Sequence, residues 1–197
     1  MPQTLPQQYD SSKFLLVAVN ILLQSINERP IHDDVELAEL EEAQLAKSTI
    51  IEVKKEVLSQ KWDINTDTQY SFPQDPAGFI PIPANVLNIF DVTGDLIMRD
   101  WRLYSKRKQS AIFSSPQKVS VVWDLEFNSL AHPIRHYITI KAARIFQART
   151  INDTTTERFS AGEEEEAYLS ARRAEGDTGQ MNMLTSAYGV ENFVLGA

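Results

Sequence analysis

The spacing of apolar residues changes twice along this chain, from a helical period to a strand period and back. The first helical face recurs every three or four residues through Ala43, Ala46, Ile50, Val53 and Val57. Apolar residues then alternate with polar ones from Val119 to Phe127, which is the period of a strand. Helical spacing returns in Ile134, Ile138, Ala142 and Ile145. This order predicts an α+β fold with strands inserted between two helical segments.

Two helices are expected before the strands. Ser12 can cap a first helix over 13–28, in which ten of the thirteen residues from Phe14 to Ile26 are apolar, and Pro30 ends it. A second helix starts at Asp33, with Glu36 three residues on, and runs to about Lys61. Acids crowd its start, at Asp33, Asp34, Glu36, Glu39, Glu41 and Glu42. This order suits the helix dipole.

The middle of the chain predicts a small antiparallel sheet over residues 67–127. Residues 86–92, a turn at Thr93-Gly94-Asp95 and residues 96–104 are expected to form a hairpin. Pro81 and Pro83 confine residues 79–82 to an edge or an excursion from the sheet.

Two further helices are expected after the sheet. A third helix opens at His132-Pro133 and is basic, with Arg135, Lys141, Arg144 and Arg149 and no acid between 131 and 149. Thr154 and Glu157 have the spacing of a capping box at the start of a fourth helix, which is expected to reach about Glu175. Residues 176–197 combine glycine with scattered large apolar residues, which is typical of an arm that folds on a partner.

The expected architecture is therefore an antiparallel bundle of about four helices with an inserted small sheet and an extended C-terminal arm. The predicted division is 1–66 and 128–175 for the helical domain, 67–127 for the β domain and 176–197 for the arm.

Composition excludes several classes of chemistry. The 197 residues include no cysteine, which excludes a disulfide framework, a thiolate metal site and a cysteine nucleophile. The formal charge of −8 argues against a free-standing DNA-binding domain, which usually carries a basic footprint. The apolar run from Phe14 to Val19 is too short for a membrane span or a signal peptide, so we expect synthesis in the cytoplasm and no membrane partner.

The motifs that resemble catalytic or metal sites have simpler structural interpretations. His132 and His136 have metal-site spacing, but Pro-Ile-Arg between them favours a surface or interface pair. Asp177-Thr178-Gly179 spells the aspartic protease triplet, yet it follows a helix rather than an apolar strand, which favours a glycine that ends the helix. The acidic run from Glu163 to Glu166 favours a solvated or intersubunit face. We expect no catalytic residue, no metal and no cofactor.

Residues 99–108 carry five cations and one acid, with Trp101 and Tyr104 interleaved. Such mixing can mark nucleic-acid contact, or a hairpin tip that meets an acidic protein neighbour.

An ordered set of residues from about 15 to 185 resembles the tail tubular protein A family, the head-to-tail adaptors (gatekeepers) of short-tailed bacteriophages. The resemblance is carried by Ala18-Val19-Asn20, Ile21-Leu22, Ser25-Ile26, Glu28, Pro30, Trp62, Ile64-Asn65, Lys141-Ala142, Arg144, Phe146, Arg149, Glu163–Ala167, Arg172 and Asn182-Met183-Leu184. The resemblance implies a non-enzymatic virion protein. Twelve copies would form a ring between the portal and the tail nozzle, assembled in the host cytoplasm, and double-stranded DNA would leave through its channel.

The interface candidates are the basic helix, the acidic run and the apolar arm. They are Arg135, Lys141, Arg144, Arg149, Glu163, Glu164, Glu165, Glu166, Tyr188, Phe193 and Leu195. Two other functions remain open, a tail-associated cell-wall or polysaccharide hydrolase and a DNA-binding or packaging factor that uses residues 99–108.

Overall fold

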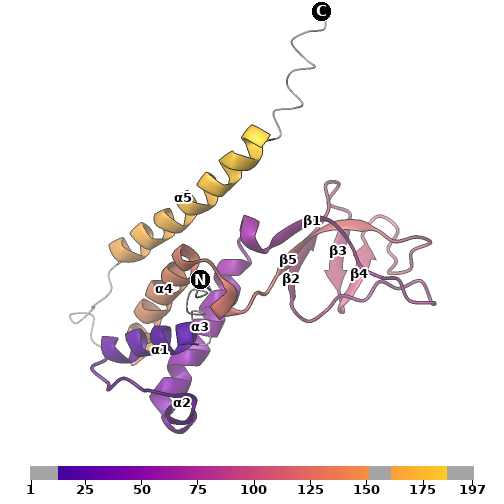
Figure 1. Ribbon diagram of the computed structural model, residues 1–197. Coiled ribbons are helices and arrows are strands. Elements are labelled where there is room, and N and C mark those ends of the chain that lie inside the picture. The colour runs from indigo at the N-terminus through magenta and orange to yellow at the C-terminus, as the bar shows by residue number, and fades with distance from the viewer. Residues whose placement is uncertain (1–12, 151–160, 186–197) are drawn as a thin grey trace, which may run out of the picture. The chain divides into compact units, whose positions relative to one another are not determined.

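A computed structural model of the protein describes residues 13–150 and 161–185. The chain divides into two compact units. The helical unit comprises Met1–Lys54 and Glu126–Ala171, and the sheet unit comprises Lys55–Leu125 and Arg172–Ala197. Helices and small antiparallel sheets both occur, which confirms the predicted α+β fold class (Figure 1).

The described residues form five α-helices, two short 3-10 turns and five strands. The helices are α1 (Phe14–Ser25), α2 (Asp34–Glu39), α3 (Glu41–Leu58), α4 (His132–Thr150) and α5 (Ala161–Thr185). The 3-10 turns are η2 (Asp63–Asn65) and η3 (Phe127–Ser129). The strands are β1 (Thr66–Ser71), β2 (Val86–Phe90), β3 (Leu96–Arg99), β4 (Arg102–Ser105) and β5 (Lys118–Trp123).

Helix α1 packs against α4 and ends earlier than expected, at its own C-terminal turn (Figure 1). Asn27 has a φ of 62°, and its amide donates to the carbonyl of Gln24. The amide of Glu28 donates to the carbonyl of Leu23. This left-handed ending is one that asparagine and glycine favour after a helix. The prediction that Pro30 ends the helix is therefore wrong, because the chain has already turned at Asn27.

The second predicted helix is two helices in the structure. Leu40 separates α2 from α3 with an extended backbone, φ −90° and ψ 119°. Asp34 and Glu36 lie in the first turn of α2, and Glu41 and Glu42 lie in the first turn of α3. The prediction of one continuous helix is therefore wrong. The acids that we assigned to the start of one helix lie at the starts of two helices, and each pair interacts favourably with the dipole of its own helix.

The predicted helix start at Asp33 is confirmed. Its carboxylate accepts hydrogen bonds from the amides of Val35 and Glu36, at 3.0 and 2.9 Å. The Glu36 carboxylate accepts from the amide of His32 at 2.7 Å, one residue earlier than in a standard capping box. The helical face predicted along α3 is confirmed as well. All five of its residues are buried, namely Ala43, Ala46, Ile50, Val53 and Val57.

Helix α4 begins at His132 as predicted, and α5 extends further than predicted. The inner stripe of α4 is buried at Ile134, Ile138 and Ala142 and half-buried at Ile145. The prediction that a helix ends near Glu175 is wrong, because α5 continues to Thr185. An interior glycine such as Gly176 costs a helix about 1 kcal/mol, which weakens a helix without ending it.

The predicted cap at Ser12 lies outside the described residues, and so do two other parts of the sequence-based predictions. They are the cap formed by Thr154 and Glu157, and the last part of the arm with Tyr188, Phe193 and Leu195.

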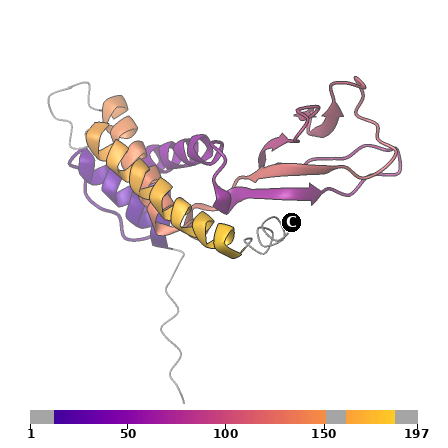
Figure 2. The same ribbon diagram turned by 90° about the horizontal axis from the view of Figure 1, so that it is seen from above.

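The sheet unit holds two small antiparallel sheets. The central strand β5 pairs with β1 on one side and β2 on the other, and β3 pairs with β4 (Figure 2). The predicted hairpin of 86–92 with 96–104 is wrong, because the second segment folds back on itself at Asp100 and Trp101. Both residues have positive φ, 50° and 56°, as a two-residue hairpin turn requires.

One apolar core lies between the two sheets. It includes Phe72, Ile80, Ile89, Leu103, Phe113, Val119 and Val121. Ile80 and Ile82 belong to this core. The backbone around them makes only isolated bridges, at Phe79 and Pro81, consistent with the excursion expected from the two prolines.

Candidate assembly surfaces

A fully buried tryptophan anchors the end of α3 within the sheet unit. The Trp62 indole nitrogen donates to the carbonyl of Val57 at 2.7 Å. The Asn65 amide nitrogen donates to the carbonyls of Leu58 and Trp123, at 3.0 and 2.8 Å. The Arg172 guanidinium lies 3.7 Å from the centre of the Trp62 ring. Residues that carry the family resemblance therefore meet at one structural joint.

Helix α5 is tied to the same joint by a carboxylate. Glu175 accepts a 2.6 Å hydrogen bond from the backbone amide of Asp63 and a 2.8 Å bond from Arg172. These contacts give Arg172 and Glu175 a role in folding the sheet unit.

Three of the basic residues predicted as interface candidates have partners inside the same chain. Arg149 makes a bidentate ion pair with Glu52, at 2.8 and 2.9 Å. This hydrogen-bonded pair lowers the pKa of Glu52 and raises the pKa of Arg149. Arg144 forms a 2.5 Å ion pair with Glu164 in the first turn of α5.

Arg135 is held by backbone oxygen and by an aromatic ring. It donates to the carbonyl of Leu130 at 2.6 Å, and its guanidinium lies 3.8 Å from the centre of the Phe14 ring. Burial lowers the pKa of Arg135. Its position serves the contact between α4 and α1.

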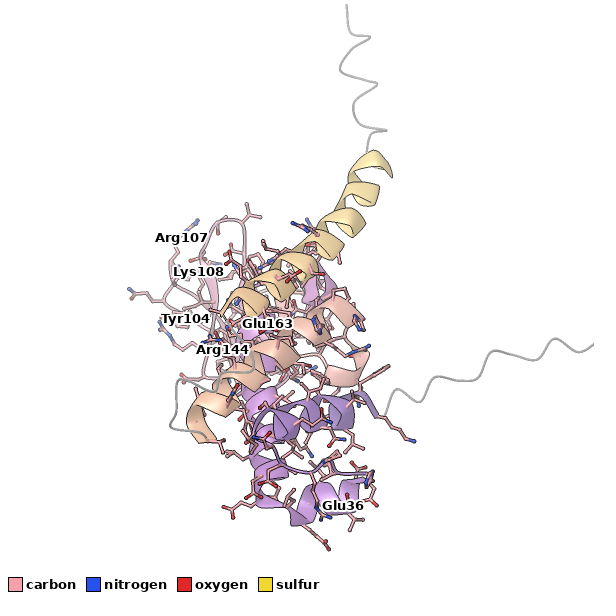
Figure 3. The ribbon with its side chains drawn as sticks, turned by 90° about the vertical axis from the view of Figure 1, so that its left-hand side faces the viewer. Glu36, Tyr104, Arg107, Lys108, Arg144 and Glu163 are labelled. Carbon is pink, nitrogen blue, oxygen red and sulfur yellow. The ribbon has the colours of Figure 1, made fainter. Side chains whose placement is uncertain are left out.

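The acidic run begins α5 beside α4. Figure 3 labels Glu163 next to Arg144, the partner of Glu164. Glu165 and Glu166 are exposed, whereas Lys141 is half-buried. The run and the basic helix were both predicted as interface candidates, and Glu164 and Arg144 pair with each other within one chain. Contact of these residues with another subunit stays a prediction.

The histidine pair and the Asp-Thr-Gly triplet both lie on helices. The rings of His132 and His136 stack with centres 6.1 Å apart on the exposed face of α4. Asp177-Thr178-Gly179 lies inside helix α5, so the prediction of a glycine helix end there is wrong. Within residues 13–150 and 161–185, no three His, Asp or Glu residues gather as a metal site would require.

The basic segment 99–108, which we call the basic hairpin, comprises the last residue of β3, the turn, β4 and the start of the following loop. Asp95 fixes this loop, because its carboxylate accepts from the amide of Arg107 at 2.6 Å and from the Ser105 hydroxyl at 2.8 Å. These bonds lower the pKa of Asp95. The side chains of Lys106, Arg107 and Lys108 are exposed, and Figure 3 labels the latter two at the edge of the sheet unit.

An acidic surface in the helical unit is the second strongly charged region. It comprises residues 33–42, with six acids and no lysine or arginine. Beside it, α2 and α3 enclose a depression of about 570 Å³. The depression has a mixed lining, with apolar Leu37, Ala38 and Ile51 and polar Asp34, Gln44, Lys47 and Ser48. Sequence reasoning identified the acids but not the depression, which exists only because the chain turns at Leu40.

None of the described helices is both long and apolar enough to cross a bilayer.

Comparison with known proteins identifies the family. The family model described as tail tubular protein matches residues 16–181, a span that includes described parts of both units. A similar protein is tail tubular protein A of Klebsiella phage KP34, which is 31% identical over 117 residues. That alignment covers 58% of this chain and 61% of the phage protein, less than two thirds of its length. Because the family model matches most of the chain, this protein belongs to the tail tubular protein family.

Proposed function

We propose that this protein is a structural component of a short-tailed phage, the head-to-tail adaptor that forms a ring of twelve copies between portal and tail nozzle. The observation that carries the proposal is the family match over residues 16–181, which includes the α-helices and the strands alike. The related phage protein is named for the tail tube, and a tube is built from repeated copies around a channel.

Several residues behind the resemblance have clear structural roles, which supports a shared fold. Asn20 fixes the chain after α1 through two hydrogen bonds to the backbone of Ile31, at 2.9 and 2.8 Å. Trp62 and Asn65 organise the end of α3. Arg149 joins α4 to α3. A chain that retains these joints retains the framework of the family.

The charge of the chain suits a passage for DNA. Phosphate neutralisation by cations is what makes proteins hold DNA, and a formal charge of −8 on each copy opposes it. A ring of such subunits lets DNA slide during ejection. We therefore assign the protein a role in retaining and releasing the genome, with the portal and the nozzle protein as its partners.

Reconstitution on the portal tests this proposal. The purified full-length chain is mixed with the purified portal ring of the same phage, and the particles are imaged by electron cryomicroscopy. We expect one additional layer with twelve-fold symmetry on one face of the portal. Particles that remain bare portal at saturating protein would contradict the proposed function. Hydrolysis of peptidoglycan by the chain, abolished by one Asp or Glu substitution, would point to the hydrolase instead.

A further inference from the structure

The tip of the basic hairpin carries a tryptophan where the backbone favours glycine. Asp100 and Trp101 have φ of 50° and 56°, and turns of this kind normally carry asparagine and glycine. A bulky side chain at positive φ is strained. Trp101 also leaves 56% of its surface exposed. Trp101 is also not among the core residues of the sheet unit, so its presence at this strained position points to a contact outside that unit.

Cations surround this tryptophan along the hairpin and loop. Arg99 stacks on Tyr104 with its guanidinium 3.9 Å from the ring centre, and Arg102 lies 4.3 Å from the centre of the Phe79 ring. Lys106 and Lys108 are exposed on a loop whose backbone Asp95 already holds. Among the described residues, neither lysine forms an ion pair. Their charge remains available to an acidic partner.

The acidic surface of the same chain offers matching features. Asp34, Glu39 and Glu41 are exposed, and none of them is engaged in an ion pair within the described part of the chain. The depression beside them offers the apolar side chains of Leu37, Ala38 and Ile51, within a lining that also includes the polar residues named above. An aromatic anchor in an apolar pocket, surrounded by charged pairs, is the usual arrangement of an interface hot spot.

We propose that the basic hairpin of one copy docks on the acidic surface of the next copy in the ring, with Trp101 seated in the depression between α2 and α3. This inference rests on the proposed function, since it needs a ring. A cyclic ring closes through head-to-tail contacts, in which each subunit presents two different and complementary surfaces. The chain has one surface rich in cations and another rich in acids, and opposite charges also fix the order of docking.

Replacing the tryptophan with glycine separates folding from assembly. Trp101→Gly relieves the strained turn, so the melting temperature of the isolated chain should stay the same or rise. Ring formation on the portal should nevertheless fall about tenfold, because the aromatic anchor is lost. A Trp101→Gly chain that assembles as well as the wild type would overturn the proposal.

Charge reversal identifies the partner surface. The hairpin variant carries Lys106→Glu and Lys108→Glu, and the surface variant carries Glu39→Lys and Glu41→Lys. Each alone should assemble about tenfold less ring, because like charges then face one another. A matched control, Lys118→Glu, reverses an exposed cation outside both surfaces and should assemble normally.

Mixing the two variants in equal amounts gives the decisive result. In a mixed ring that alternates the two variants, every contact again joins opposite charges, so the mixture should recover rings. Recovery only when all four substitutions share one chain would show an intrachain contact and overturn the proposal. Normal rings from the hairpin variant that bind portal, nozzle protein or DNA more weakly would assign the hairpin to that partner and also overturn it.

The wild-type chain distinguishes the two levels of failure. Absence of wild-type rings on the portal contradicts the proposed function itself. Wild-type rings together with unaffected variants contradict only the docking of hairpin on acidic surface.

Discussion

Asn20 shows how a single polar side chain fixes a turn in the helical unit. The side-chain oxygen of Asn20 accepts a hydrogen bond from the backbone amide of Ile31, and its side-chain nitrogen donates one to the Ile31 carbonyl. Ile31 is buried. Asn20→Ala leaves both backbone groups without these partners, so we expect unfolding to cost about 1–3 kcal/mol less. Urea denaturation measures this loss. Gln60→Ala, which removes an exposed amide, is the matched control, and an equal effect of both substitutions would refute the role of Asn20.

The ion pair of Arg149 and Glu52 should make stability depend on pH. The pair lowers the pKa of Glu52, so its contribution is present above the pKa of glutamate in the unfolded chain, about 4.3, and is lost as the pH falls through the lower folded value. Glu52→Gln should therefore lower the melting temperature slightly at pH 7, with the difference vanishing in acid. Because both side chains are exposed, the effect is small. A difference that grows in acid would have the wrong sign.

The short helix α2 depends on its N-cap residue, Asp33. It has six residues, and Asp33 accepts hydrogen bonds from two of its first amides. Helices this short are not stable through propensity alone. Asp33→Ala should cost about 0.5–2 kcal/mol, and amide hydrogen exchange should accelerate in α2 while α4 remains protected. Asp33→Asn, which keeps the acceptor oxygen, is the control. Unchanged exchange in α2 after Asp33→Ala would contradict this account.

The regular helical faces were predictable because burial repeats locally. The buried residues of α3 and the cap at Asp33 needed only neighbouring sequence. The break at Leu40 was missed, since a run of acids fits one helix start or two. The β3 to β4 turn was missed because Asp100 and Trp101 lack the glycine signal.

The candidate surfaces were predictable only in part. The sequence identified the basic and acidic segments as charged runs. It does not show which cation meets which acid when the partners lie far apart in the chain, as Arg149 and Glu52 do. Those pairings depend on how whole helices pack, and so does the depression beside the acidic surface.

The net charge leads to a prediction for the whole molecule. With a formal charge of −8, the isolated chain should bind duplex DNA poorly at about 0.15 M salt. Fluorescence anisotropy with a labelled duplex measures this affinity. Binding should strengthen as salt is lowered only if the basic hairpin contacts the DNA independently of the rest of the chain. Sub-micromolar affinity at the higher salt would contradict a channel that lets DNA slide.

Electron cryomicroscopy of the mature phage shows directly whether this chain forms the proposed ring. The tail is reconstructed with the symmetry of each layer applied separately. The resulting map shows where the helical unit and the sheet unit fit. We expect twelve copies of this chain in one ring between the portal and the nozzle. Density in that layer that fits another protein, or this chain found outside the portal and nozzle axis, would contradict the account.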